Sequence, residues 1–287
     1  MLNEQLEKAI AELSAFPILP DAAIELIELA NSSAFLFKDM VSIMERDPSI
    51  AANVIQEANT QKHGRKGRIG SINQASDILN IKELAELVMN SATASYFSTG
   101  AEDGYVYLIR MRDHGVLTGR VARILAAEMG VMDANMMYLA GLIHDVGFIV
   151  LARGFWTEFS GLINQTSGDE KVMWEKEREI FGLSHAEVGA AVLEKWSYPP
   201  AIHNAIRFHH RPWDGGEYQQ LATIVHFADF LSHYMLDRSA PFDLKKKIDH
   251  FLHSPSADLV EKYGFPLTPE NFVRMTEQLE EKTRMEK

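Results

Sequence analysis

Histidine and aspartate are the residues of this chain whose types and spacing could do chemistry. The 287 residues include 11 histidines and no cysteine, so a metal held by this chain would bind imidazole and carboxylate rather than thiolate groups. Eight of the histidines lie between residues 105 and 236. Seven side chains in that part of the chain are candidate ligands: His114, His144, Asp145, His185, His209, His210 and Asp229.

Metal chemistry is indicated because several of these side chains take positions that the helical pattern otherwise gives to apolar residues. A buried imidazole is tolerated when it is hydrogen-bonded, whereas a buried carboxylate without a partner costs several kcal/mol. Imidazoles and carboxylates that face a common core would satisfy one another through a divalent ion. The alternative is structural. His144 and Asp145 could be a hydrogen-bonded pair at a helix end, and the other histidines could bond to one another and to the backbone.

Helical periodicity of apolar residues dominates the chain, and we find no run of alternating strand residues. The fold class predicted is therefore all-α. His114 lies on the buried side of a long helix predicted over 105–129, and Asp229 lies on a helix predicted over 220–235.

Three further helices should position the remaining candidates. An apolar stripe ends at His144, with Asp145 at the C-terminal end of the same helix. Ser184 and Glu187 form a capping box that begins the helix of His185. A third stripe, which begins at Ile202, ends at His209.

The chain divides into two helical lobes and an extension. Residues 1–97 form an N-terminal lobe, residues 98–236 form a second lobe after a polar joint at 98–104, and residues 237–287 form two or three short packing helices. In the first lobe, apolar stripes predict helices over 23–30, 51–58, 72–79 and 81–88, and Asp47-Pro48 is a cap followed by a proline at the first helical position.

The charge and composition of the chain limit the classes of molecule that it is expected to bind. The net charge of −12 argues against general binding to nucleic acid. The basic segment 62–68 could grip a phosphate or RNA, but it has no interleaved aromatic residues, so we favour a solvated loop. We find neither a signal peptide nor an apolar stretch long enough to span a membrane, and together with the absence of cysteine this predicts a cytoplasmic location.

The ordered set of histidines and aspartates resembles the HD superfamily of metal-dependent phosphohydrolases. The motif Gly141-Leu142-Ile143-His144-Asp145-Val146-Gly147 carries this resemblance, together with the histidine before it and the aspartate in a later helix. The resemblance implies that His114, His144, Asp145 and Asp229 hold a divalent metal. It also implies that His185, His209 and His210 could complete a second metal position, as in binuclear members.

A closer resemblance, over residues 14–236, is to the HDOD family, the HD-related output domains of bacterial signalling proteins. It rests on Phe16–Pro20, on Asp47-Pro48, on the 139–147 and 185–190 segments, on Trp196–Pro199 and on His209-His210-Arg211-Pro212. The resemblance implies two all-helical lobes, the second an HD-like bundle, in a regulatory module without a demonstrated activity. Cyclic-di-GMP phosphodiesterases of the HD-GYP type carry Glu where this chain has Arg211, and the Gly-Tyr-Pro that follows is absent here, which weakens that reading.

We therefore expect a signalling module that contacts a regulatory protein partner or a small phosphorylated ligand. The alternative is an active phosphohydrolase, in which Asp145 would orient the attacking water or accept its proton. The metal could be iron, manganese, nickel, cobalt or zinc. Arg110 and Arg112 could meet a phosphate, although such arginines are more often paired at the surface. We read Trp174, Trp196 and Trp213 as packing anchors, and His226 and His233 as a solvated face.

Overall fold

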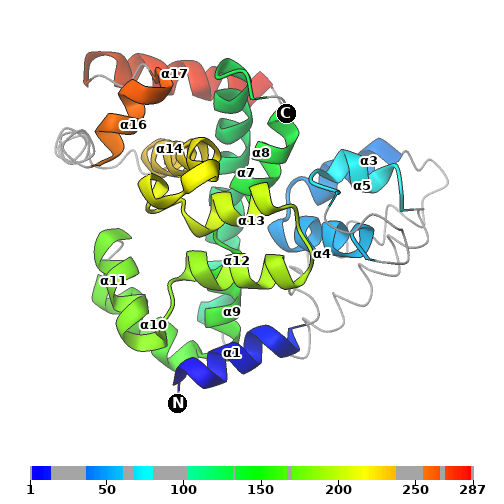
Figure 1. The fold of residues 1–287 in the computed structure, drawn as a ribbon, viewed down its shortest axis with the longest axis vertical. Helices are drawn as coiled ribbons and strands as arrows, with labels where there is room; N and C mark the ends of the chain where they lie inside the picture. The colour runs from blue at the N-terminus through cyan, green and yellow to red at the C-terminus, as the bar shows by residue number, and fades with distance from the viewer. Residues whose placement is uncertain are drawn as a thin grey trace.

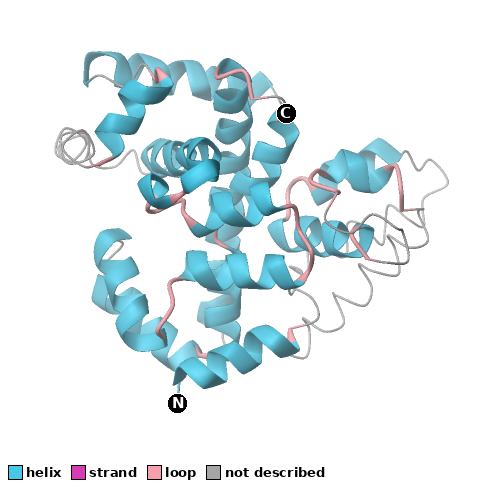
Figure 2. Cartoon of the chain, in the orientation of Figure 1, coloured by secondary structure: helices cyan, strands magenta, loops and turns pink. Residues whose placement is uncertain are grey.

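The computed structural model describes residues 2–13, 37–60, 68–79, 102–131, 133–166, 170–236, 255–265 and 269–285. Within these ranges every regular element is a helix, which confirms the all-α prediction (Figure 2). Several predicted features lie outside the described residues: the motif at 16–20, the helices at 23–30 and 81–88, most of the basic segment, and most of the joint at 98–104.

Three described helices follow one another in the first lobe: α3 (Phe37–Met44), α4 (Pro48–Ala58) and α5 (Ile72–Ser76). The predicted cap of α4 is confirmed, since Asp47 Oδ1 accepts a hydrogen bond from the backbone N–H of Ile50 at 2.9 Å and Pro48 is the first helical residue. The regular helix α5 is shorter than predicted because the backbone turns after Ser76. These helices lie to one side of the bundle in Figure 1.

The helices of the second lobe surround the candidate ligands. They are α7 (Glu102–Glu128), α8 (Ala134–Leu142), α9 (Val146–Gly154), α12 (His185–Lys195), α13 (Pro200–Arg207) and α14 (Gln219–Leu236). The helix α7 packs along α8 and α14, and α12 packs against α9 and α13 (Figure 1). The two long helices, predicted over 105–129 and 220–235, are confirmed with ends that differ by one to three residues.

Five more α-helices and two short 3₁₀ turns complete the described chain. They are α1 (Leu2–Glu12), α10 (Trp156–Thr166), α11 (Glu170–Phe181), η2 (Pro212–Asp214), η3 (Gly216–Tyr218), α16 (Ser256–Tyr263) and α17 (Pro269–Met285). Although α1 opens the chain, it packs against α9, α11 and α12 of the second lobe. The Lys195 ammonium at the end of α12 donates to the carbonyl oxygens of Ile10, Ala11 and Leu13, which closes the C-terminal end of α1. The division at residue 97 stays a prediction.

Two predicted helices end earlier than expected, and both early ends matter for the site. The helix α8 ends at Leu142, so His144 and Asp145 lie in the turn before α9 rather than on the helix. The helix α13 ends at Arg207, so His209 lies in the turn that follows. The prediction that both histidines continue helical stripes was wrong. Ile143, Asp145 and Phe208 have φ near −100° and ψ near +10°, and this bridge conformation redirects the chain.

Close helix crossings fix the position of the 143–145 turn. A Cβ at Gly115 of α7 would lie 2.5 Å from the carbonyl oxygen of Leu142, so only glycine lets α7 and α8 approach this closely. A Cβ at Gly147 would lie 1.9 Å from the carbonyl oxygen of His185, where α9 meets the first turn of α12. The two crossings hold the turn between α7 and α12.

Two tyrosine hydroxyls join the 37–60 segment to the helical bundle that surrounds the candidate ligands. Tyr138 of α8 donates to the carbonyl oxygen of Glu45, and Tyr198 donates to that of Ala52 on α4, each at 2.5 Å. Both aromatic rings are buried; the hydrogen bond of Tyr198 is buried as well, and that of Tyr138 is partly buried.

One described segment, Ala134–Gly154, is long and apolar enough to cross a membrane by length and composition, which the sequence expectation had missed. It comprises α8, the 143–145 turn and α9, and 78% of its most apolar window is buried inside the protein. Its apolar character is therefore that of core helices.

Candidate metal site

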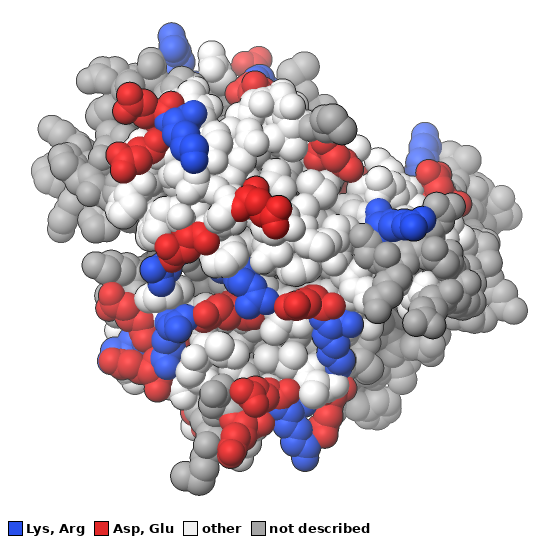
Figure 3. Space-filling model, in the orientation of Figure 1, with Lys and Arg blue, Asp and Glu red and all other residues white. Residues whose placement is uncertain are grey.

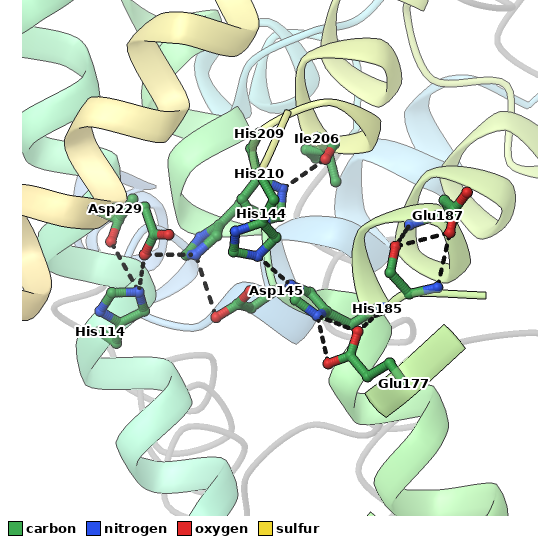
Figure 4. A network of polar contacts seen from close by, with 12 residues as sticks. His114, His144, Asp145, Glu177, His185, Glu187, Ile206, His209, His210 and Asp229 are labelled. Atoms are coloured by element: carbon green, nitrogen blue, oxygen red, sulfur yellow. Dashed lines mark hydrogen bonds and ion pairs between the residues drawn. The ribbon is translucent and has the colours of Figure 1, made fainter. Parts of the chain in front are cut away.

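The seven candidate side chains lie together in the second lobe (Figure 4). We call His114, His144 and Asp229 the first position, because one ligand atom from each lies within 4.8 Å of the other two. They come from α7, the 143–145 turn and α14. Nε2 of His114 lies 2.8 Å from Oδ1 of Asp229, and Nε2 of His144 lies 3.4 Å from the same oxygen.

We call His185, His209 and His210 the second position, whose ligand atoms meet the same 4.8 Å limit. Nε2 of His185 and Nε2 of His210 are 2.9 Å apart, so one of these nitrogens donates to the other. Asp145 stands between the two positions: Oδ2 is 3.3 Å from His144 Nε2, and Oδ1 is 3.3 Å from His185 Nε2. With one oxygen toward each position, the carboxylate of Asp145 could serve as a ligand for an ion at either of them.

Two of the rings are oriented by backbone carbonyl groups. Nδ1 of His144 donates to the carbonyl oxygen of Gly141 at 2.8 Å, and Nδ1 of His209 donates to that of Ile206 at 2.6 Å. Each ring therefore directs Nε2 into the cluster, where the atom is buried and makes no hydrogen bond. This arrangement, with Nδ1–H on a carbonyl group and Nε2 unused, is the one that protein ligands of metals adopt. The residues present fit a divalent metal.

The two oriented rings, His144 and His209, differ in pKa. Burial lowers the pKa of His209 to about 3, and charge on His144 and His185 adds to this effect, so His209 is a neutral imidazole at neutral pH. Burial also opposes protonation of His144, but the carboxylates of Asp145 and Asp229 outweigh it and hold the pKa of His144 well above its usual range. Burial would raise the pKa of Asp145, yet His144 and His185 hold it well below its usual range. The cluster thus favours a positive charge beside these carboxylates.

Glu177 is a member of the network that the sequence prediction missed. This fully buried glutamate of α11 accepts hydrogen bonds from His185 Nδ1, at 2.8 Å and 2.9 Å to its two oxygens, and from the backbone N–H of His185 at 2.7 Å. The signal was present, because Glu177 shares a helical face with Met173, Ile180 and Phe181, where an apolar residue is expected. Burial lowers the pKa of His185, but Glu177 and Asp145 outweigh it and raise that pKa to about 10.

His233 is exposed, as the reading of a solvated face expects, but it also contacts two of the candidate ligands. Its ring stacks on His114 with 4.1 Å between centroids, and its Nε2 lies 3.4 Å from Asp229 Oδ1, although its side chain is 49% exposed. Burial would raise the pKa of Asp229, yet His233, His114 and His144 hold it well below its usual range. His226 lies one turn before Asp229 on α14. It is half-buried, and its Nε2 lies 2.9 Å from the Ser256 hydroxyl oxygen of α16.

The remaining predicted residues lie in other environments. Arg110 is exposed, and Arg112 forms an ion pair with Asp113 at 3.2 Å. Trp196 is buried, consistent with a packing anchor, whereas Trp174 is half-buried and is contacted by the guanidinium groups of Arg178 and Arg211. On the face shown in Figure 3, acidic and basic side chains of the described residues are intermixed, and no broad basic patch forms there.

The fold and the site define an all-helical protein that gathers five histidines and two aspartates in the core of one lobe. Among known families, the HDOD domain matches residues 16–212, more than half of the chain. The chain belongs to the HDOD family. Asp229 lies beyond the matched residues, and the described geometry brings it to the cluster.

The chain is also similar to individual relatives and to solved structures. An uncharacterized protein of Treponema pallidum is 23% identical over 246 residues, which are 83% of this chain and 46% of that protein, so the chain spans about half the length of this relative. Ribonuclease Y of Thermus thermophilus is 32% identical over 119 residues, which are 42% of this chain and 16% of that enzyme. The MmoQ response regulator of Methylococcus capsulatus shares the fold with a TM-score of 0.71 at 17% identity, over 92% of this chain and 98% of that one.

Proposed function

We propose that this chain is a signalling module whose second lobe binds a divalent metal at the first position and its neighbour Asp145, with the second position available to another ion. The observation that carries the proposal is the Nε2 atom of His144. This atom is buried, its ring is oriented by Gly141, and it faces carboxylate oxygens of Asp145 and Asp229 at 3.3 Å and 3.4 Å. A buried nitrogen that faces two carboxylates requires a proton or a metal ion.

The regulatory part of the proposal is supported by family and fold. The chain belongs to the HDOD family and shares its fold with a response regulator. We expect it to act in the cytoplasm through a regulatory protein partner, with a small phosphorylated ligand as a second kind of partner. Iron, manganese, nickel, cobalt and zinc all suit the mixed nitrogen and oxygen donors of the site.

The second candidate function is phosphoester hydrolysis, and Asp145 is the observation that favours it. A divalent ion bound here would lower the pKa of a water molecule and polarise a phosphoryl oxygen. Asp145 reaches toward both positions and is only partly buried, so its carboxylate would orient the attacking water or accept its proton. The similarity to ribonuclease Y, over less than half of this chain, is consistent with a phosphodiester substrate.

Metal analysis and a substrate panel test both functions. The purified chain and its His144→Ala variant would be titrated with Mn²⁺ and with Zn²⁺, and assayed on phosphomonoesters and phosphodiesters. His203→Ala is the matched control, because His203 is a buried histidine of α13 outside the candidate groups. Saturating metal should raise the unfolding temperature of the wild type and of the His203 variant but not of the His144 variant, since only binding to the folded state stabilises it.

The outcomes separate the two functions. Metal binding without turnover supports the signalling module, whereas turnover that disappears in the His144 variant alone supports the phosphohydrolase. A wild type that binds neither ion, with its fold intact, would overturn the metal site.

A further inference from the structure

The ring of His185 is fixed on several sides, and only its Nε2 edge faces the other candidate ligands. The carboxylate of Glu177 accepts hydrogen bonds from the Nδ1–H and from the backbone N–H of His185. The ring of Phe148, from α9, stacks on the imidazole with 3.9 Å between centroids and 20° between planes. The remaining atom, Nε2, faces Asp145 at 3.3 Å and His210 at 2.9 Å.

The way in which His185 is held differs from that of its neighbours. His144 and His209 are oriented by neutral backbone carbonyl groups, which satisfy a core histidine without burying any additional charge. His185 is oriented by a carboxylate with no exposed surface, on a different helix. Burying a carboxylate costs several kcal/mol unless positive charge compensates it, and beside His185 that charge is either a second proton on the imidazole or a bound cation.

We infer that Glu177 is the positioning residue of a cation bound at the second position. By holding Nδ1 of His185 protonated, it keeps the lone pair of Nε2 directed at the space shared with His209 and His210. The carboxylate–histidine pair also makes the imidazole a stronger donor and supplies negative charge behind an otherwise all-imidazole group. This inference rests on the proposed metal-binding function. It adds a second bound ion and the residue that positions one of its ligands.

The test uses Zn²⁺ titrations of the full chain and of its Glu177→Gln variant. Glutamine keeps the size of the side chain, and one amide oxygen can still accept from both N–H groups of His185, as Oε2 of Glu177 does, but the negative charge behind the imidazole is removed. The wild type should bind two equivalents of zinc. The variant should bind the first with unchanged affinity and the second about 10- to 100-fold more weakly, the usual loss when the partner of a ligating histidine is removed.

Glu187→Gln is the matched control, because Glu187 is also a hydrogen-bonded carboxylate near the α11–α12 junction but bonds Ser184 and Arg178 instead of a candidate ligand. This variant should keep both zinc affinities. Nitrogen-15 spectra of labelled histidine give a readout that a structural role would not move: the second equivalent of zinc should shift the Nε2 signal of His185 in the wild type, and less in the Glu177 variant at the same zinc concentration. The same spectra check the hydrogen bond itself. In the zinc-loaded wild type the Nδ1–H proton of His185 should resonate far downfield, as expected beside a carboxylate, and it should move upfield in the Glu177 variant alone.

Several results would overturn the inference. Zinc affinity at the second equivalent that is unchanged by Glu177→Gln would make Glu177 a structural residue. A wild type that binds a single equivalent would remove the second ion while leaving the metal-binding function intact. If the variant does not fold, the wild-type spectra decide: addition of the second equivalent must shift the Nε2 signal of His185 while the Nδ1–H signal persists.

Discussion

The two candidate metal positions use the same kinds of side chain but obtain their negative charge differently. In the first position the carboxylate of Asp229 is itself a candidate ligand, and three imidazoles lie within 3.4 Å of one of its oxygens. The second position is a group of three imidazoles whose nearest dedicated carboxylate, Glu177, stands behind His185. One position therefore depends on a ligand and the other on a supporting residue, so different substitutions should damage them.

Gly147→Ala should cause the largest loss of stability, because it disturbs the crossing of α9 and α12 that positions His185. The added methyl group would lie 1.9 Å from the carbonyl oxygen of His185, and two backbones rather than a flexible side chain would have to move. Overpacking of this kind costs ~3 kcal/mol or more of unfolding free energy. Chemical denaturation measures this loss, with Gly161→Ala in α10 as the control, since nothing lies within 4 Å of that added Cβ. Equal midpoints for the two variants would contradict the close crossing.

Asp229→Asn should have the next largest effect and should fall on the first position. It removes the charge that three imidazoles share, so the first equivalent of zinc should bind at least ~100-fold more weakly, beyond the usual loss for a supporting residue. The second equivalent should keep its affinity. Calorimetric titration measures both, with Asp214→Asn as the control, because Asp214 is an exposed carboxylate paired with Arg211. Equal weakening of both equivalents would show that the two positions are one site.

Glu187→Gln should have the smallest effect, on stability alone. Partial burial would raise the pKa of Glu187, but hydrogen bonds from Ser184 and the Arg178 guanidinium outweigh it and lower that pKa from its ordinary value of 4.5. A lowered folded-state pKa adds stability above the unfolded-state value, and this contribution disappears as the pH falls through the folded-state value. The wild type should therefore exceed the variant by ~1 kcal/mol at pH 7, and the difference should shrink below pH 4.5. A difference that is constant from pH 7 to pH 3 would contradict this assignment.

The sequence predicted the framework of the site better than its supporting residues. Helical periodicity and the caps at Asp47 and Ser184 were sufficient to predict α4, α7, α12 and α14, because both are local signals. The helices α3, α9, α10 and α11 were not predicted. The ends of α8 and α13 could not be read, since the bridge conformations that redirect the chain depend on tertiary packing of the 143–145 and 208–210 turns. The turn residues nevertheless reach the cluster.

Two members of the network lay outside the prediction for different reasons. Glu177 sits on a helix rich in acidic residues, where one more glutamate looks like part of a solvated face unless its helical position is checked. His233 is half exposed, and only the packing of α14 beside α7 brings its ring onto His114. Burial predicted from periodicity finds residues in the core, but it does not find an exposed side chain that covers a buried site.

The hydrogen bonds from Lys195 to the end of α1 mean that α12 is fixed at both ends. Its first residue is His185 in the second position, and its last residue holds the carbonyl groups of the N-terminal helix. An α-helix of 11 residues is a stiff rod about 16 Å long. The helix α12 therefore connects α1 to the cluster mechanically. A displacement of α1 would be felt at His185 without any direct contact between α1 and a ligand bound at the cluster.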